Sequence, residues 1–127
     1  MNMNLEYFND FESFIIKNKG SGKTFVLYAA SNTLIDLDYA KDSNITFTGG
    51  VFPQVIFSNK LYKNGLISIE ITSEFEVRFI DDIQNKLKEE ILECRSLISI
   101  VNGFSEYNES FLSDLFEKLP LDTNIIG

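Results

Sequence analysis

The residues with the greatest capacity for chemistry are glycines and polar or aromatic side chains that follow two short apolar runs. They are Gly49, Gly50, Phe52, Gln54, Asn102, Gly103 and Ser105. Glycine has no Cβ, so a ligand or another backbone can approach it closely. An amide side chain donates and accepts hydrogen bonds, and free N–H groups at the start of a helix favour a carboxylate. These seven residues therefore predict a binding site for a small anionic or zwitterionic molecule.

Both segments also have a purely structural interpretation. Gly49 and Gly50 are typical of a tight corner between strands, with Phe52 in the core. Asn102–Ser105 fits an ordinary glycine turn in which Ser105 caps the next helix. The second segment has the stronger positional argument, because ligands of layered α/β folds bind beyond the carboxyl ends of parallel strands.

The residue inventory argues against catalysis and against a metal centre. The chain has no His, so it lacks the commonest general base and the commonest metal ligand. Cys94, the single cysteine, has no His to activate it and fits a buried apolar position. Gly20–Thr24 lacks the first glycine of a phosphate-binding loop and precedes a predicted strand instead of a helix. We therefore expect no catalytic residue, no bound metal and no cofactor.

Charge and the lack of targeting segments restrict the partners. Nineteen acidic residues against eleven basic ones leave a net charge of -8 in 127 residues. A negative field repels phosphate backbones and anionic lipids, so neither nucleic acid nor a membrane is an expected partner. The N-terminus lacks the basic and apolar regions of a signal peptide, and no apolar run reaches the ~20 residues of a membrane span. With one cysteine and no intrachain disulfide, a cytoplasmic location is expected.

The first third of the chain is expected to contain a helix, a buried strand and a short helical turn. Apolar residues spaced by three, three and four predict a helix over Leu5–Asn18, capped by Asn4. Thr24–Ala30 is continuously apolar apart from its first residue, which is typical of a strand covered on both faces. Leu34–Tyr39 predicts one or two helical turns.

An antiparallel meander is expected between Ile45 and Phe79. Ile45–Thr48 is a predicted strand that ends at the glycine pair, and Asn64–Gly65 is the commonest signature of a tight type I′ hairpin turn. Apolar residues then alternate with polar ones over Ile67–Phe79, which predicts a strand with one apolar face and one acidic, solvated face.

The second half of the chain alternates helices and strands. Periodicity predicts a helix over Ile80–Cys94, a strand over Ser96–Val101 and a helix that begins after Ser105 and ends at Pro120. A final strand is predicted over Thr123–Gly127. The expected fold class is therefore mixed α/β: a layered mixed sheet, the meander, and a C-terminal half that resembles a βαβ unit.

Two segments together resemble the FIST N-terminal domain, a bacterial sensory domain. The first runs from Phe47 through the glycine pair to Ile67, and the second comprises Leu97–Ser105 and Thr123–Gly127. The resemblance implies a signal-transduction protein that binds small ligands such as amino acids, and it carries over no catalytic residues. Family domains continue past the strand that resembles Ile125–Gly127. The chain is therefore expected to be either a single domain over 1–127 or the N-terminal portion of a larger FIST-like domain.

Three functional hypotheses follow from these observations. The first is a non-enzymatic sensory domain that binds a small molecule, an amino acid or another small acid, and communicates with a signalling domain or protein partner. The alternative is an interaction module that uses exposed sheet edges to bind a protein or a second copy of the chain, giving a homo-oligomer. The third is an enzyme of unknown class that uses an Asp, Glu or Lys with a displaced pKa.

Overall fold

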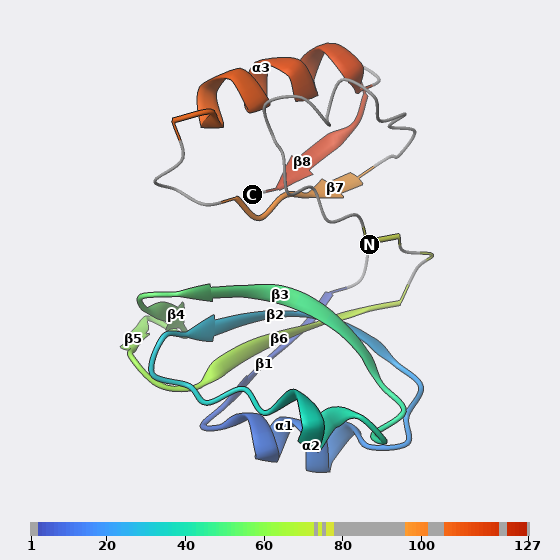
Figure 1. Ribbon diagram of the computed structural model, residues 1–127, viewed down its shortest axis with the longest axis vertical. Coiled ribbons are helices and arrows are strands. Elements are labelled where there is room, and N and C mark those ends of the chain that lie inside the picture. Colours follow the sequence, from blue (N-terminus) through green and yellow to red (C-terminus); the bar gives the residue numbers. More distant parts are fainter. Residues whose placement is uncertain are drawn as a thin grey trace. The chain divides into compact units, whose positions relative to one another are not determined.

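The computed structural model describes residues 3–72, 74, 76–77, 96–101, 106–119 and 122–126. The chain divides into two compact units, Met1–Val77 and Arg78–Gly127, and each is described by itself (Figure 1). The helix predicted over 80–94, with Cys94, lies outside the described residues, as do Asn102, Gly103, Ser105 and Pro120.

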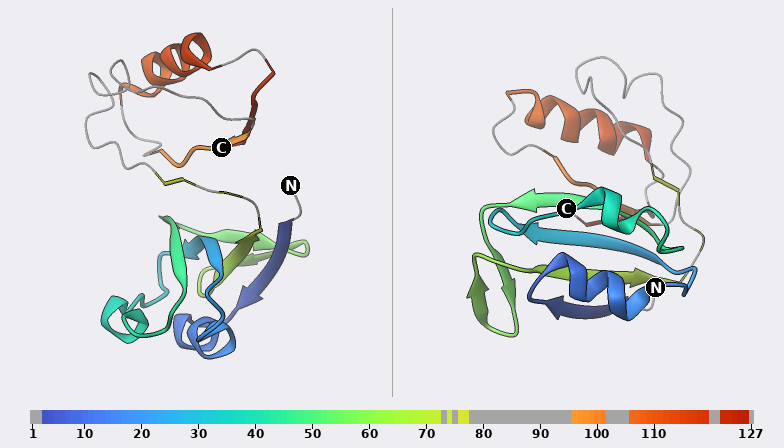
Figure 2. Two further views of the ribbon diagram at one scale, coloured as in Figure 1. Left: turned by 90° about the vertical axis from the view of Figure 1, so that its right-hand side faces the viewer. Right: turned by 60° about the horizontal axis from the view of Figure 1, so that its bottom comes forward.

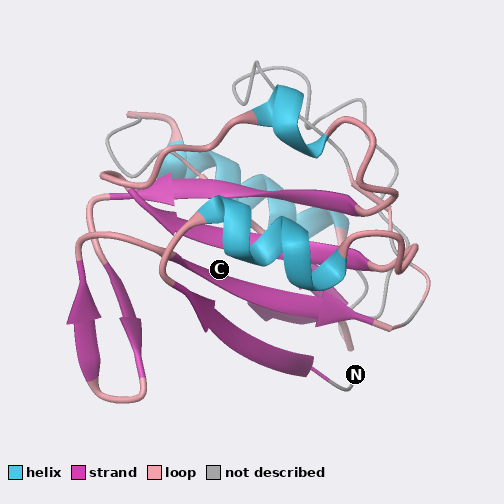
Figure 3. Cartoon of the chain, turned by 90° about the horizontal axis from the view of Figure 1, so that it is seen from below, coloured by secondary structure: helices cyan, strands magenta, loops and turns pink. Residues whose placement is uncertain are grey.

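A four-stranded mixed sheet forms the centre of the first unit. Its strands are β1 (Met3–Phe8), β6 (Leu66–Ile71), β2 (Thr24–Ala30) and β3 (Thr46–Phe52), in that spatial order. β2 and β3 are parallel, whereas β6 lies between β1 and β2 and is antiparallel to both. Helix α1 (Phe11–Asn18) connects the parallel strands β1 and β2 and lies across one face of the sheet (Figure 3). The mixed α/β class is therefore confirmed, in the form of a split βαβ unit.

The first ten residues correct the predicted helix over Leu5–Asn18. Residues 3–8 form β1, and the helix begins only at Phe11, so the first half of the prediction was wrong. The helix cap is Asp10, whose carboxylate accepts a hydrogen bond from the Ser13 backbone N–H at 2.7 Å, and not Asn4. Pairing of all six β1 residues with β6 overrides the local helical spacing, because strand formation depends on partners distant in sequence.

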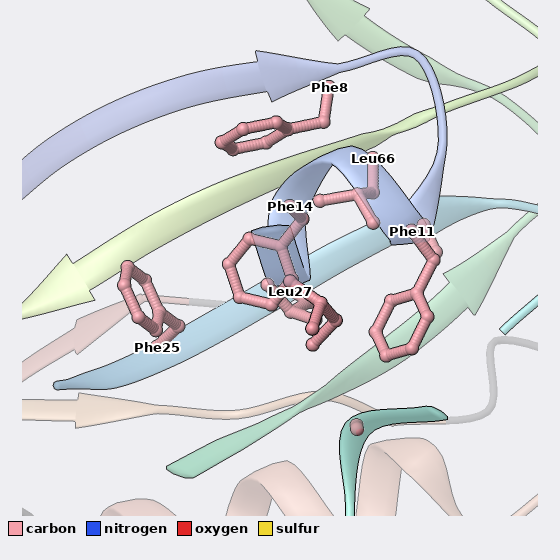
Figure 4. Close-up of a cluster of buried hydrophobic side chains, with 9 residues drawn as sticks. Phe8, Phe11, Phe14, Phe25, Leu27 and Leu66 are labelled. Atoms are coloured by element: carbon pink, nitrogen blue, oxygen red, sulfur yellow. The ribbon is translucent and has the colours of Figure 1, made fainter. Parts of the chain in front are cut away.

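Phenylalanines dominate the core between α1 and the sheet (Figure 4). Phe14 is fully buried, with its ring centroid 5.1 Å from that of Phe25 and 5.5 Å from that of Phe8. Both contacts are edge-to-face, an arrangement that aromatic rings favour. Phe47 of β3 adds a further edge-to-face contact with Phe14 at 6.2 Å. One helix residue therefore joins β1, β2 and β3.

Strands between residues 46 and 71 do not pair in chain order. β3 pairs with β2 and continues through the glycine pair, whereas β4 (Val55–Phe57) and β5 (Lys60–Tyr62) form a separate antiparallel hairpin. The tight turn of that hairpin is Ser58–Asn59, where both residues have positive φ, 47° and 64°. The hairpin predicted at Asn64–Gly65 was wrong, because the strand after it joins β1 and β2 and not β5. The predicted meander is thus reduced to β4 and β5.

The polar residues of β6 do not form the solvated face that their alternation predicts. Ser68 is only 3% exposed, and it lies on the same face of the strand as Leu66, which packs in the core beneath α1. Glu70 accepts a hydrogen bond from the Asn4 amide at 3.0 Å and pairs with Lys23 Nζ at 2.9 Å. The alternation identified the strand correctly, but this side is not solvated, because Ser68 is buried and Glu70 is paired with Asn4 and Lys23. β6 ends at Ile71, earlier than predicted.

The second unit contains a parallel βαβ arrangement. β7 (Ser96–Ile98) pairs in parallel with β8 (Asn124–Ile126), and α3 (Asn108–Lys118) lies between them in sequence (Figure 2). The predicted parallel strand–helix–strand unit is therefore confirmed. Along α3, Phe111 and Leu115 are buried, whereas Leu112 and Phe116 are exposed, so the apolar stripe is narrower than predicted. Among the described residues, no helix combines the length and apolar character that crossing a membrane requires.

Candidate functional site

A hollow of the first unit lies where β1 and β2 end and α1 begins. Its volume is about 400 Å³. The lining residues come from the β1–α1 junction, from the segment after β2, from α2 (Leu37–Ala40) and from the loop before β6. They are Asn9, Asp10, Phe11, Glu12, Asn32, Thr33, Leu34, Tyr39 and Asn64. This is the edge of an α/β sheet at which ligands commonly bind.

Hydrogen bonds fix the backbone on two sides of the hollow. The Thr33 hydroxyl donates to the Gly65 carbonyl and accepts from the Gly65 N–H, both at 2.7 Å. The Ala30 N–H donates to the same carbonyl at 2.9 Å, and the Tyr7 hydroxyl donates to the Asn64 carbonyl at 2.7 Å. The segment after β2 is thereby held against the start of β6. These hydrogen bonds therefore fix the backbone that bears Asn32 and Asn64.

Negative charge and amide groups dominate the lining. Hydrogen bonds from Ser13 hold the pKa of the Asp10 carboxyl below its usual range, so this group is a carboxylate at neutral pH. Glu12 supplies a second acidic side chain, and none of the described residues lining the hollow is basic. Three Asn amides and the Tyr39 hydroxyl add hydrogen-bonding groups, while Phe11 and Leu34 add apolar surface. Such a lining suits a small ligand with an ammonium group.

The structure places four of the seven sequence-predicted site residues. Gly49 and Gly50 lie together inside β3 and line a smaller hollow of about 170 Å³. Phe52 ends β3, with its ring centroid 5.3 Å from that of Tyr28, and Gln54 is an exposed residue between β3 and β4. Neither of these two lines either hollow. The remaining three residues, at 102, 103 and 105, are among those not described.

Sequence reasoning missed the residues that line the larger hollow. Asn9 and Asp10 were assigned to the interior of a helix, whereas they form the turn between β1 and α1. One signal was available: Asn and Asp are typical of turns and helix caps, and they recur here after the two apolar stretches that become β1 and β2. Their convergence depends on β6, which holds β1 beside β2 from a distant part of the chain.

No group of three or more His, Cys, Asp or Glu in the described part of the chain is arranged to hold a metal ion. No protein-family model, curated protein or solved structure matches this chain. The candidate site therefore depends on its geometry and charge.

The Asp10 cap gives a prediction about pH. Because the pKa of its carboxyl is lowered in the folded state, its contribution to stability is present above the unfolded value of about 3.9 and is lost as the pH falls through the lower folded value. We expect Asp10→Ala to lower the urea midpoint at pH 7, and the difference from the original chain to shrink below pH ~3.

Asp10→Asn is the matched variant, because asparagine caps helices about as well as aspartate without a titrating group. It should unfold near the original midpoint at pH 7. An Asp10→Ala deficit that is the same at both pH values would contradict the assigned role of the carboxylate.

Proposed function

We propose that this chain is a non-catalytic, ligand-binding sensory domain of a bacterial cytoplasmic signalling protein, akin to the FIST N-terminal domain. Its ligand is a small zwitterion of the amino-acid class. The observation that carries the proposal is the hollow of about 400 Å³ in which amides from three separate chain segments meet two acidic side chains. This volume lies within the roughly 300–1,000 Å³ typical of small-molecule sites.

The lining accounts for each part of such a ligand. An ammonium group pairs with Asp10 and Glu12, since charge-assisted hydrogen bonds are stronger than neutral ones. Asn32 and Asn64 offer amide donors to a carboxylate. An aliphatic ligand side chain contacts Leu34, whose side chain is 84% exposed. The acidic lining favours a zwitterion over a simple anion, which sharpens the expectation drawn from the sequence.

The protonation state of Asp10 supports binding over catalysis. A general acid or base works best with a pKa near the operating pH, whereas the pKa of Asp10 is shifted downward, away from neutrality. A permanent carboxylate suits recognition of a cationic group. In a sensory protein, occupation of the hollow would be passed to a signalling domain or protein partner.

A thermal-shift screen of the full chain tests the proposal. The probes are the common L-amino acids, their decarboxylated amines and their deaminated acids. We expect stabilisation by one or more amino acids, reaching about 2.7 kcal/mol at 100 times the dissociation constant, and none by the acid that lacks the ammonium group. If no amino acid or amine shifts the transition, the proposal is wrong.

Paired variants locate the binding. Glu12→Gln removes one acidic group from the hollow and should weaken binding by about three- to tenfold. Glu109→Gln is its control, because Glu109 also lies in the first turn of a helix but on α3. Asn32→Ala should likewise weaken binding, whereas Gln54→Ala, an exposed amide outside the hollow, should not. Equal effects of site and control variants would place the ligand elsewhere.

A further inference from the structure

In the described part of the chain, the outer edge of β3 has no strand beside it. β3 is the last strand of its sheet, and no described strand pairs with it on the side away from β2. The Thr46 N–H donates to the Lys23 carbonyl at 2.9 Å, so the backbone groups of Thr46 point toward β2. Because the backbone groups of a strand alternate between its two edges, those of Phe47 and Val51 face outward. They can hydrogen-bond to an additional strand.

β3 also contains no charged residue and no proline, two features that often protect a sheet edge. Edge strands usually carry a charged residue or a proline that prevents pairing. β3, with the sequence TFTGGVF, contains neither, and Val51 is 65% exposed. The opposite edge strand, β1, carries Glu6, which is paired with Lys17 of α1. The two edges therefore differ, and β3 is the one suited to pairing.

A hollow of about 170 Å³ adjoins this edge. Its lining is almost entirely apolar and comprises Leu27, Ala29, Ile35, Phe47, Thr48, Gly49, Gly50 and Val51. A lined apolar cavity of ~150 Å³ admits a benzene-sized group, so this hollow accepts one aliphatic or aromatic side chain. Peptides that extend a sheet bind by this combination, in which backbone hydrogen bonds give affinity and a side-chain pocket gives specificity.

Charge distinguishes a heterologous partner from a second copy. Asp36 and Asp38 are exposed and follow Ile35, which lines the hollow. The whole chain carries a net charge of -8, so two copies repel each other, whereas a basic segment is attracted. We infer that β3 binds an extended basic peptide, which adds to the sheet as a further strand, places one apolar side chain in the hollow and sets Lys or Arg beside Asp36 and Asp38.

Selection from a phage library of short random peptides on the immobilised full chain tests this inference. Enriched peptides should carry one large apolar residue flanked by Lys or Arg and should lack proline at the centre. Each is then synthesised, and its affinity is measured by fluorescence anisotropy. Val51→Pro removes an outward N–H and should weaken binding by about tenfold or more, whereas Val51→Thr keeps the N–H and the β-branched side chain and should bind nearly as the original chain does.

A second set of variants keeps the test decisive if Val51→Pro does not fold. The Asp36→Asn/Asp38→Asn pair retains the helix cap at residue 36 and should weaken binding by about fivefold at low salt. The control pair Glu109→Gln/Glu117→Gln changes the net charge equally on α3 and should have little effect. Enriched peptides without basic residues, no enrichment at all, or equal binding by site and control pairs would overturn the inference. A dimer in sedimentation experiments that Val51→Pro dissociates would overturn it as well, since the occupant would then be a second copy.

Discussion

Phe14→Ala is expected to lower the free energy of unfolding by about 3–5 kcal/mol, the range for removing a fully buried phenylalanine. Phe14 has no exposed surface, and its ring contacts rings from β1, β2 and β3. Truncation therefore leaves a cavity that a single neighbour cannot fill. Because small proteins are stable by only about 5–15 kcal/mol, much of the folded population should be lost on mild heating.

Ile16→Ala is the matched control for this prediction. Ile16 lies two residues further along the same helix, but its side chain is 63% exposed. Its truncation should change the free energy of unfolding by no more than about 0.5 kcal/mol. Urea unfolding followed by far-ultraviolet circular dichroism measures both variants. Similar midpoints for Phe14→Ala and the original chain would disprove the proposed packing of α1 on the sheet.

Gly65→Ala, the second large effect, is expected to lower the free energy of unfolding by about 3 kcal/mol or more. Gly65 has a φ of 97°, a conformation that residues with a Cβ rarely adopt. An added Cβ would also meet the Tyr7 hydroxyl and would lie 2.6 Å from the Phe8 carbonyl oxygen. Both neighbours belong to β1, so the substitution separates the start of β6 from the end of β1. The ligand proposed for the larger hollow should bind less tightly as well.

Gly22→Ala separates backbone strain from the steric clash. Gly22 also has a positive φ, 67°, but no atom lies within 4 Å of the position that its Cβ would take. Gly22→Ala should therefore lower the free energy of unfolding only by the strain of the left-handed conformation, roughly 1–2 kcal/mol. Chemical denaturation of the two variants gives the comparison. If both variants lose the same free energy of unfolding, the steric clash at Gly65 contributes nothing to the effect of Gly65→Ala.

Local patterns in the sequence predicted those elements whose neighbours are close in the chain. The apolar run 24–30 predicted β2, and the strand–helix–strand order after residue 96 predicted the parallel pair β7 and β8. The alternation over Ile67–Ile71 identified β6, apart from its first residue. For β2 the apolar run also agrees with the burial, since most of its residues are buried.

The failures concern pairings between distant segments. β1 has a helical spacing of apolar residues, and only its pairing with β6 makes it a strand. Asn64–Gly65 has the local signature of a hairpin turn, yet Gly65 is needed for its close contact with Tyr7 and Phe8. The lining of the larger hollow depends on both features. The candidate site was therefore less predictable than the fold class, because its residues meet only through β6.

The position of β6 between β1 and β2 also determines the order in which the first unit can fold. Asn4 and Glu70, which are hydrogen-bonded across β1 and β6, are 66 residues apart in sequence. During synthesis, β1, α1 and β2 leave the ribosome long before the strand that joins them. Until then, two apolar strands lack their central partner. Sheets closed by such distant pairs fold slowly, because the entropy of a long loop is lost before the contacts form. Until β6 is synthesised, the edge of β2 that later pairs with β6 is therefore exposed. During this period the nascent first unit is most prone to aggregation.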